Sequence, residues 1–383
     1  MDFLLNDEQA AIREMAVSFA ADQIAPHALD WDRDRHFPLD VLRQAAGLGL
    51  AGMMVDPDFG GSGLGRVDAV LVYEALATGC PAISAYLSIH NMVASMIGRH
   101  GSDGQKAAFL PRLCAGDIWA SYCLTEPGSG SDAAALSTRA ERNGDDYVLT
   151  GQKMFISGAG ETDLYVVMAR SSGPGPKGIS AFILEKGMAG LSFGANERKM
   201  GWNAQPTRTV AMDGVRVPAS AMLGPDGAGF KLAMEALDGG RTSIAACSLG
   251  GAQAAFDKAC AYMGDRRAFG QKLTDFQALQ FALADMATDL EVGRTFLWRA
   301  AAALDARLPE ATRLCAMAKK HVTDMGFDVA NRALQLHGGY GYLADYGVEK
   351  IVRDLRVHQI LEGTNEIMRM IIARSVLAES AHG

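Results

Sequence analysis

Two acidic side chains and one imidazole near the C-terminus have a spacing that could do chemistry. Asp354, His358 and Glu362 lie four residues apart, so on a helix they would share one face and could bind a metal ion. Gly363 follows directly and favours the end of a helix, so we expect no metal site. Three of the residues 357–361 are apolar, and a carboxyl in such surroundings has a raised pKa. Glu362 is therefore the candidate general base.

Two other segments have the composition of a ligand-binding surface. Tyr122–Asp132 follows an expected strand, and its glycines and hydroxyls allow close backbone approach and hydrogen bonding to a ligand. Lys153–Gly158 places an aromatic beside a serine on a strand, where a flat ring could stack and be hydrogen-bonded. A surface turn and an ordinary core strand are the alternative interpretations.

Two further segments could contact phosphate or expose backbone amides. Arg266–Gly270 leads into a helix, and its first residue could pair with phosphate, although a solvated charge is the ordinary interpretation. Gln335–Tyr342 contains Gly-Gly-Tyr-Gly inside helical sequence, which predicts a bend. The patterns GxSxG, HExxH and the P-loop are absent. Gly60–Gly65 does not fit GxGxxG and follows no strand, which excludes a Rossmann interpretation.

The elements that must position these segments change along the chain. Near the N-terminus, Asn6 and Gln9 predict a capping box, and Pro26 predicts the end of that helical segment. Helical sequence resumes over Val67–Arg112. A strand over Ile118–Leu124 then opens a β-rich region.

The β-rich region contains a strong hairpin signal. Asn143-Gly144 separates two extended stretches. Short strands are expected at Leu164–Ala169, Ile179–Leu184 and Thr207–Met212, which together favour a small barrel or sandwich. From Gly229 the helical period returns.

The last third predicts a bundle of long antiparallel helices, because two apolar stripes recur at spacings of three and four. The first stripe consists of Phe276, Leu279, Leu283, Met286, Leu290, Gly293 and Leu297, and the second of Ala318, Val322, Met325, Val329, Ala333 and Leu336. We expect three domains, an α-helical domain over 1–118, a β domain over 119–225 and a helical bundle over 226–383.

Composition narrows the function classes. The 383 residues include 49% hydrophobic and 21% charged residues, a balance typical of a globular protein. The net charge of −8 argues against general nucleic-acid binding. None of the six cysteines forms a CxxC pair, and we expect them buried and reduced. The N-terminus is acidic and shows no targeting peptide. The charge-free run Ala75–Gly98 contains Pro81 and His90, so we do not expect it to span a membrane. We therefore expect a cytoplasmic protein.

Together the chemistry-bearing segments closely resemble the acyl-CoA dehydrogenase family over essentially the whole chain. The resemblance is carried by YxxTEPxxGSD, an RxxFG…FQ stretch, QxxGGxGY and a late EGT, in the family's order and spacing. It implies an N-terminal α-helical domain, a central β-barrel and a C-terminal four-helix bundle, usually in a homotetramer. It also implies FAD bound without a Rossmann motif.

The resemblance assigns residues to the cofactor and the substrate. Flavin contacts are expected from Tyr122, Leu124, Thr125, Gly130, Ser131, Phe155, Ile156 and Ser157. Contacts to the FAD of a neighbouring subunit are expected from Arg266, Phe269, Phe276, Gln277, Gln335, Gly338 and Gly339, and contacts after the base from Thr364 and Glu366. The substrate side is expected to include Ser131, Asp238, Arg241 and Arg374.

The family's chemistry removes an α-proton and a β-hydride from an acyl-CoA thioester. Some relatives carry the base on an earlier helix, where this chain has Gly240, so the role falls to Glu362. FAD is expected to accept the hydride and electron-transfer flavoprotein the electrons. The sequence is most like short branched-chain members that act on isobutyryl-CoA in valine breakdown, with 2-methylbutyryl-CoA and butyryl-CoA as alternatives.

Three other interpretations remain open at this stage. They are an acyl-CoA oxidase, a non-catalytic relative that binds DNA, and a helical scaffold without cofactor. Acyl-CoA oxidases usually carry an added C-terminal domain, which we do not expect in this sequence. A protein that binds DNA would be expected to have a basic face, which conflicts with the net charge of −8.

Overall fold

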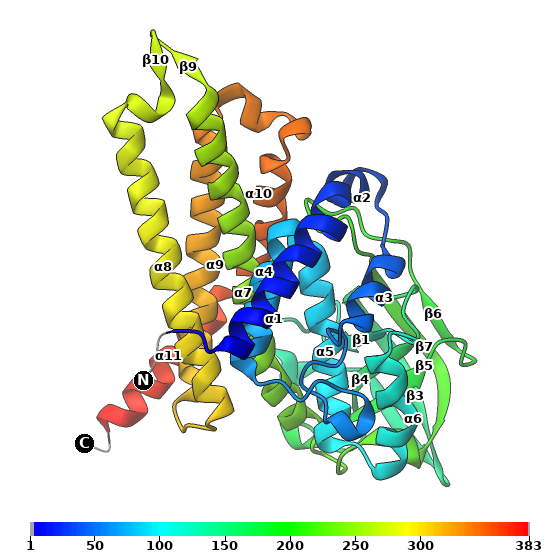
Figure 1. Cartoon of the computed structure of the whole chain (residues 1–383). Coiled ribbons are helices and arrows are strands. Elements are labelled where there is room, and N and C mark those ends of the chain that lie inside the picture. Colours follow the sequence, from blue (N-terminus) through cyan, green and yellow to red (C-terminus); the bar gives the residue numbers. More distant parts are fainter. Residues whose placement is uncertain (1–3, 382–383) are drawn as a thin grey trace.

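The computed structural model describes residues 4–381, and Figure 1 shows three parts that follow one another along the chain. The first part is helical. Its helices are α1 (Asp7–Phe19), α2 (Ala28–Asp34), α3 (Leu39–Gly47), α4 (Arg66–Gly79), α5 (Pro81–His100) and α6 (Asp103–Cys114). The predicted helical sequence over 67–112 is therefore confirmed as three helices.

The start of α1 confirms the predicted capping box. Asn6 Oδ1 accepts a hydrogen bond from Gln9 N at 2.8 Å, and Gln9 Oε1 accepts one from Asn6 N at 3.3 Å. The predicted end at Pro26 is wrong. The chain passes through a π-turn and a 3-10 turn, Ala25–His27, and continues into α2. Pro26 lies in the first turn of that 3-10 segment, where a missing amide N–H costs no hydrogen bond.

The middle part is one sheet of eight strands. Its strands are β1 (Ala120–Cys123), β2 (Arg139–Asn143), β3 (Asp146–Ser157), β4 (Leu164–Arg170), β5 (Ile179–Glu185), β6 (Leu191–Phe193), β7 (Thr207–Pro218) and β8 (Met222–Leu223). Asn143 pairs with Asp146 across the predicted hairpin. The neighbour order is β6-β7-β3-β2-β4-β5-β8, and β1 pairs with β4 in parallel.

The last part is built from long helices. They are α7 (Gly229–Asp265), α8 (Gln277–Asp305) and α9 (Ala311–Leu336), followed by α10 (Val348–Arg356) and α11 (Asn365–Ser380). A small hairpin of β9 (Arg267–Ala268) and β10 (Gln271–Lys272) joins α7 to α8 at the tip of the bundle (Figure 1). Within residues 4–381, no helix has the length and apolar character needed to cross a membrane.

Burial confirms both apolar stripes of the bundle. Met286 and Leu297 of α8 are buried, as are Val322 and Val329 of α9. Helix α7 packs against α8 and α9 of the bundle and also against α4 and α5 of the N-terminal part. Because the N-terminal half of α7 is where the parts meet, groups from several elements can converge there.

Candidate active site

Glu362 lies in an irregular segment between α10 and α11. Helix α10 ends at Arg356, and one 3-10 turn, Val357–Gln359, follows it. Glu362 and Gly363 both have left-handed backbone, with φ of 56° and 86°. Asp354, His358 and Glu362 therefore do not share a helical face, and the described residues contain no metal-ligand cluster.

The carboxyl of Glu362 points at the surface of α7. A Cβ atom added at Gly240 would lie 2.4 Å from Glu362 Oε2 and 2.9 Å from its Cδ. Any side chain at position 240 would thus occupy the space that the carboxyl now fills. Oε2 is buried and has no hydrogen-bond partner among the described residues, which leaves an oxygen available to a ligand.

Burial raises the pKa of Glu362 to about 7, and the positive charges of Arg241 and Lys319 oppose this rise. The sequence predicted the direction correctly but not the surroundings. Ile360, one of the apolar neighbours in sequence, is 50% exposed. The carboxyl is instead desolvated by its packing against α7. A carboxyl that titrates near neutral pH suits a general base.

Two predicted substrate residues lie beside Glu362 on α7. Arg241 is buried and donates from Nη1 to Asp238 Oδ1 at 2.5 Å, while Asp238 Oδ2 also accepts from Thr312 Oγ1 at 2.6 Å. Arg241 Nε is buried without a partner. The other two predicted substrate residues, Ser131 and Arg374, are exposed and are not part of this network.

The predicted ligand loop after β1 is held against β3 by a buried ion pair. Lys153 Nζ donates to Glu126 Oε1 at 2.7 Å and to Leu124 O at 3.0 Å. Glu126 also accepts from Ser137 N at 2.6 Å and Thr138 N at 2.9 Å. Burial would raise the pKa of Glu126, but Lys153 and these donors outweigh it and lower the pKa to about 2.

At the start of this loop, Tyr122 is brought close to Glu362. Its Oη is buried and has no partner among the described residues. Burial raises the pKa of Tyr122, and the charge of Glu362 raises it further. Thr125 accepts a hydrogen bond from Met154 N at 2.8 Å through its carbonyl, which fixes the loop to the strand that carries Phe155. Gly130, further along the loop, is exposed.

Phe155 interrupts the pairing of β3. It has a left-handed φ of 61°, lies at a register shift between Lys153 and Ile156, and is 59% exposed. Ile156 is buried, and Ser157 accepts from Ser121 Oγ at 2.6 Å through its carbonyl. The bulge therefore turns an aromatic ring out of the sheet, next to the ligand loop.

The cofactor residues expected to reach a neighbouring subunit lie at the tip of the bundle. Figure 1 places the β9–β10 hairpin at the end of the bundle away from the sheet. Phe269, on this hairpin, has φ of 52° and is 96% exposed, and its ring meets Phe276 edge-on at 6.3 Å. Gln277 is also exposed at the start of α8.

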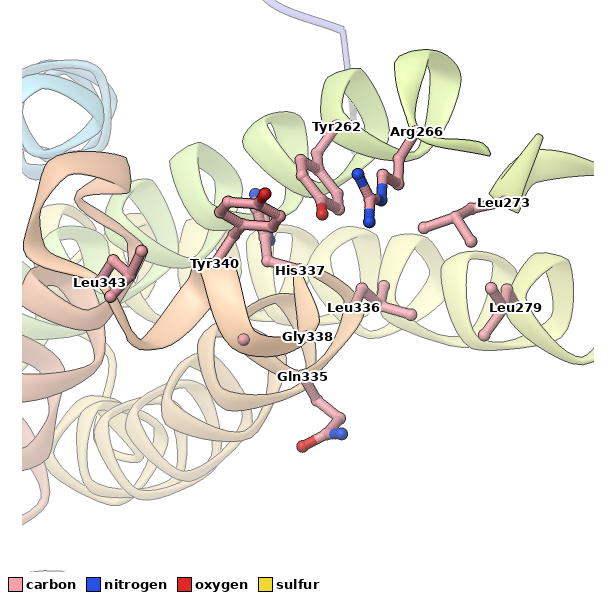
Figure 2. Close-up of a pocket in the computed structure, with 11 residues that line it drawn as sticks. Tyr262, Arg266, Leu273, Leu279, Gln335, Leu336, His337, Gly338, Tyr340 and Leu343 are labelled. Carbon is pink, nitrogen blue, oxygen red and sulfur yellow. The ribbon is translucent and has the colours of Figure 1, made fainter. Parts of the chain in front are cut away.

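A cavity of about 540 Å³ lies beside this hairpin (Figure 2), lined in part by Arg266, Gln335, Gly338 and Gly339. The guanidinium of Arg266 lies over the Tyr340 ring at 5.5 Å from the centroid. Figure 2 shows the Gln335 side chain pointing away from these two residues.

Thr364 and Glu366 begin α11. Thr364 Oγ1 accepts from Ile367 N at 3.3 Å and caps the helix, and Glu366 pairs with Arg369 at 2.9 Å on the surface. The structure thus brings together Glu362, Arg241, Asp238 and Tyr122. The bundle-tip residues lie apart from them within one chain.

Sequence reasoning missed Lys319, which holds the segment of Glu362. Lys319 is fully buried on α9 and donates from Nζ to Gly363 O at 2.8 Å and to Asn365 Oδ1 at 2.9 Å. A usable signal was present, because a lysine lies next to the apolar stripe position Ala318, and a buried lysine needs partners.

Domain models of one protein family match all three parts of this chain. The N-terminal, middle and C-terminal domain models of acyl-CoA dehydrogenase match residues 6–117, 121–215 and 227–377. The chain is 52% identical over 375 residues to mitochondrial isobutyryl-CoA dehydrogenase of Bos taurus, covering 98% of this chain and 90% of that protein. The enzyme of the same name from Dictyostelium discoideum is 50% identical over 373 residues, with 97% and 90% covered.

Solved structures agree with these matches. Butyryl-CoA dehydrogenase from Megasphaera elsdenii superposes with a TM-score of 0.96 at 36% identity, covering 98% of this chain and 100% of that chain. A chain from a structural study of the electron transferring flavoprotein of Acidaminococcus fermentans superposes with a TM-score of 0.96 at 38% identity, covering 98% of this chain and 100% of that chain.

Proposed function

The chain belongs to the acyl-CoA dehydrogenase family, and on that premise we propose that it uses FAD to convert a short branched-chain acyl-CoA into its α,β-unsaturated thioester. The observation that carries the proposal is the carboxyl of Glu362. It has a buried oxygen without a partner, a pKa raised to about 7, and a position over Gly240 beside Arg241. These are the properties of a general base that meets its substrate in a desolvated site.

The residues present fit a flavin. Tyr122 Oη, Arg241 Nε and Glu362 Oε2 are buried polar atoms that lack partners within residues 4–381. Buried polar atoms are normally paired, so unpaired ones near a single carboxyl favour a bound ligand there. Phe155 adds an exposed ring beside the ligand loop. Residues 122–131 and 155–157 would hold the ring system.

In this proposal each group of the chain has a defined task. Glu362 removes the α-proton of the thioester. FAD, when bound, supplies the acceptor for the β-hydride. The pair of buried Arg241 and half-buried Asp238 orients the thioester side of the substrate and keeps a positive charge near the carboxylate. The ion pair of Lys153 and Glu126 keeps the ligand loop in place.

Isobutyryl-CoA is the proposed substrate. Two relatives with this name are 52% and 50% identical to the chain over almost its whole length. Butyryl-CoA is the second candidate, because the Megasphaera elsdenii enzyme has the same fold at 36% identity. One methylene in an apolar pocket is worth only about 1–3 kcal/mol, so we expect overlapping activity on 2-methylbutyryl-CoA and butyryl-CoA.

The cofactor site is proposed to need a second copy of the chain. Arg266, Phe269, Phe276 and Gln277 lie on or next to the β9–β10 hairpin, and Figure 1 shows this hairpin at the bundle tip, away from β3, the strand that carries Phe155. An aromatic ring that is 96% exposed suits a contact with another subunit better than contact with water. A homotetramer in which each tip reaches a neighbour's FAD would use both groups. Electron-transfer flavoprotein is the proposed acceptor, and the cytoplasmic location stays a prediction, since both relatives are named as mitochondrial enzymes.

Turnover on a panel of thioesters tests the proposal. Purified protein would be assayed with isobutyryl-, 2-methylbutyryl- and butyryl-CoA, while flavin absorbance is followed without oxygen. We expect a yellow protein whose absorbance is bleached by substrate, with isobutyryl-CoA giving the highest kcat/KM. The Glu362→Gln variant should keep its flavin and lose the bleaching. A colourless protein, or bleaching that survives in Glu362→Gln, would contradict the proposal.

A further inference from the structure

Lys319 binds the main chain directly after Glu362. Its side chain is fully buried on α9, and both acceptors of its ammonium, Gly363 O at 2.8 Å and Asn365 Oδ1 at 2.9 Å, are neutral. Desolvating an ammonium is costly, so a lysine in this place needs a reason that packing alone does not provide. The two acceptors lie one and three residues after Glu362, which connects the lysine to the proposed base.

The segment that carries Glu362 requires such an anchor. Two consecutive residues, Glu362 and Gly363, have left-handed backbone, and a non-glycine residue keeps that conformation only where its surroundings enforce it. Lys319 holds the segment on its C-terminal side. Asn365 in turn donates from Nδ2 to Asp324 Oδ1 at 2.7 Å, so α9 fixes this side through two residues.

The N-terminal side of the segment is fixed separately. His358 contacts Ser248 Oγ through Nδ1 at 2.7 Å and accepts from Trp202 Nε1 at 3.1 Å. Gln359 donates from Nε2 to Asp324 Oδ1 at 2.8 Å. The segment that carries Glu362 is therefore held on both sides by hydrogen bonds. Among the side chains that hold it, Lys319 is the cation.

Lys319 also belongs to the charges that face the carboxyl. From α7 these are the cation Arg241 and the thiol of Cys247, from α9 the ammonium of Lys319, and from β1 the phenol of Tyr122. Arg241 is already paired with Asp238. Burial lowers the pKa of Lys319 to about 7, and the charge of Glu362 opposes this, so the ammonium and the carboxylate favour each other's ionised forms. Arg241 disfavours the ammonium, and Asp324 and Glu366 favour it. Asp324 is engaged by Lys320 at 3.2 Å and Glu366 by Arg369 at 2.9 Å.

We propose, on the premise that Glu362 is the base, that Lys319 is its positioning residue. Its ammonium holds the left-handed turn through Gly363 and Asn365, so that the carboxyl lies over Gly240, and its charge favours the ionised carboxylate. Removing the ammonium should therefore change both the rate of proton removal and the pH at which it begins. Substrate binding through Arg241 and Asp238 should change little.

Proton removal can be measured apart from oxidation with acetyl-CoA. Acetyl-CoA has α-hydrogens but no β-carbon, so the flavoenzyme can exchange its α-protons with D2O and cannot dehydrogenate it. Exchange would be followed by mass spectrometry across pH for wild type, Lys319→Met and the control Lys258→Met, which removes an exposed lysine of α7. Lys319→Met should slow exchange about 100-fold at pH 7, the cost of a misplacement near 1 Å. Its pH midpoint should rise by about one unit.

A second variant separates anchoring from charge. Asn365→Ala removes one acceptor of Lys319 and keeps the ammonium, so exchange should slow while the pH midpoint stays that of wild type. If Lys319→Met fails to fold, the Asn365→Ala variant decides the test. The Lys258→Met control should match wild type in rate and midpoint.

The outcomes distinguish the premise from the inference. Exchange in Glu362→Gln equal to that of wild type would remove the base assignment, and the inference with it. If Glu362→Gln loses exchange, the base assignment stands. In that case, exchange in Lys319→Met with the rate and pH midpoint of wild type, or wild-type exchange in Asn365→Ala, would overturn only the inference about Lys319. A Lys319→Met protein that is less stable but whose folded fraction exchanges as wild type would assign the lysine a structural role only.

Discussion

Gly240 leaves the space that the carboxyl of Glu362 fills, so replacing it with alanine should damage catalysis and spare the fold. The added Cβ would lie 2.4 Å from Glu362 Oε2 and 3.1 Å from Oε1. Non-bonded atoms prefer about 3.5–4.0 Å, so the carboxyl must move by roughly 1 Å. A displacement of that size in a reacting group costs about 100-fold in rate, or about 2.7 kcal/mol of activation free energy.

The effect of Gly240→Ala on stability should be small. All three of the nearest atoms belong to the end of the Glu362 side chain, which can rotate away. Forcing that side chain from its preferred rotamer costs about 0.5–1.5 kcal/mol, while alanine in a helix interior gains about 1 kcal/mol over glycine. The free energy of unfolding should therefore change by less than about 1 kcal/mol.

The assay compares kcat with isobutyryl-CoA and urea unfolding for wild type, Gly240→Ala and Gly264→Ala. Gly264 lies on the same helix and has no atom within 4 Å of an added Cβ, so its alanine variant changes only helix propensity. We expect wild-type kcat in Gly264→Ala and a loss of about 100-fold in Gly240→Ala. Wild-type kcat in Gly240→Ala, or a loss of several kcal/mol in its stability, would refute the reasoning.

Three further predictions concern charge. Because a base must be ionised, kcat/KM should rise with pH through about 7, the raised pKa of Glu362, and a rise centred near 4.5 would contradict this assignment. A folded-state pKa above the ordinary 4.5 means that the native protein loses stability as pH rises from about 4.5 to 7, by up to about 3 kcal/mol. Glu362→Gln should therefore be more stable than wild type in urea at pH 8 and gain little at pH 4.5; an equal difference at both pH values would count against it. Glu126→Gln should cost about 3–5 kcal/mol in urea unfolding because it leaves Lys153 buried without its carboxylate, whereas Glu141→Gln, which breaks an exposed pair with Arg139, should cost under about 1 kcal/mol.

The parts of the fold that depend on short-range signals could be predicted from the sequence. The capping box at Asn6 and Gln9 and the turn at Asn143-Gly144 each depend on residues within four positions of one another. The bundle stripes depend only on helical period. Pro26 was misjudged because a proline ends a helix only when it falls inside one, and here it begins a new turn.

The sequence predicted several residues that the structure brings together, but not the contacts that hold them in place. The resemblance identified Glu362, Arg241, Asp238 and Tyr122, and the structure gathers them around one carboxyl. The anchor of that carboxyl was missed because Lys319 and Gly363 are 44 residues apart, and their contact arises only when α9 packs against the segment after α10. The desolvation of Glu362 likewise comes from α7 rather than from Ile360, its neighbour in sequence.

Besides the side chains of Arg241 and Asp238, helix α7 contributes two consecutive glycines that leave room for charged groups of other elements. A Cβ at Gly239 would lie 2.6 Å from the guanidinium of Arg66, and a Cβ at Gly240 would lie 2.4 Å from the carboxyl of Glu362. Two glycines inside a helix cost about 2 kcal/mol in helix propensity relative to alanine. The two glycines allow two charged groups, Arg66 of α4 and Glu362 of the segment before α11, to pack against consecutive positions of one helix. A side chain at position 240 and the carboxyl of Glu362 would compete for the same space, so the observed position of Glu362 requires glycine at 240.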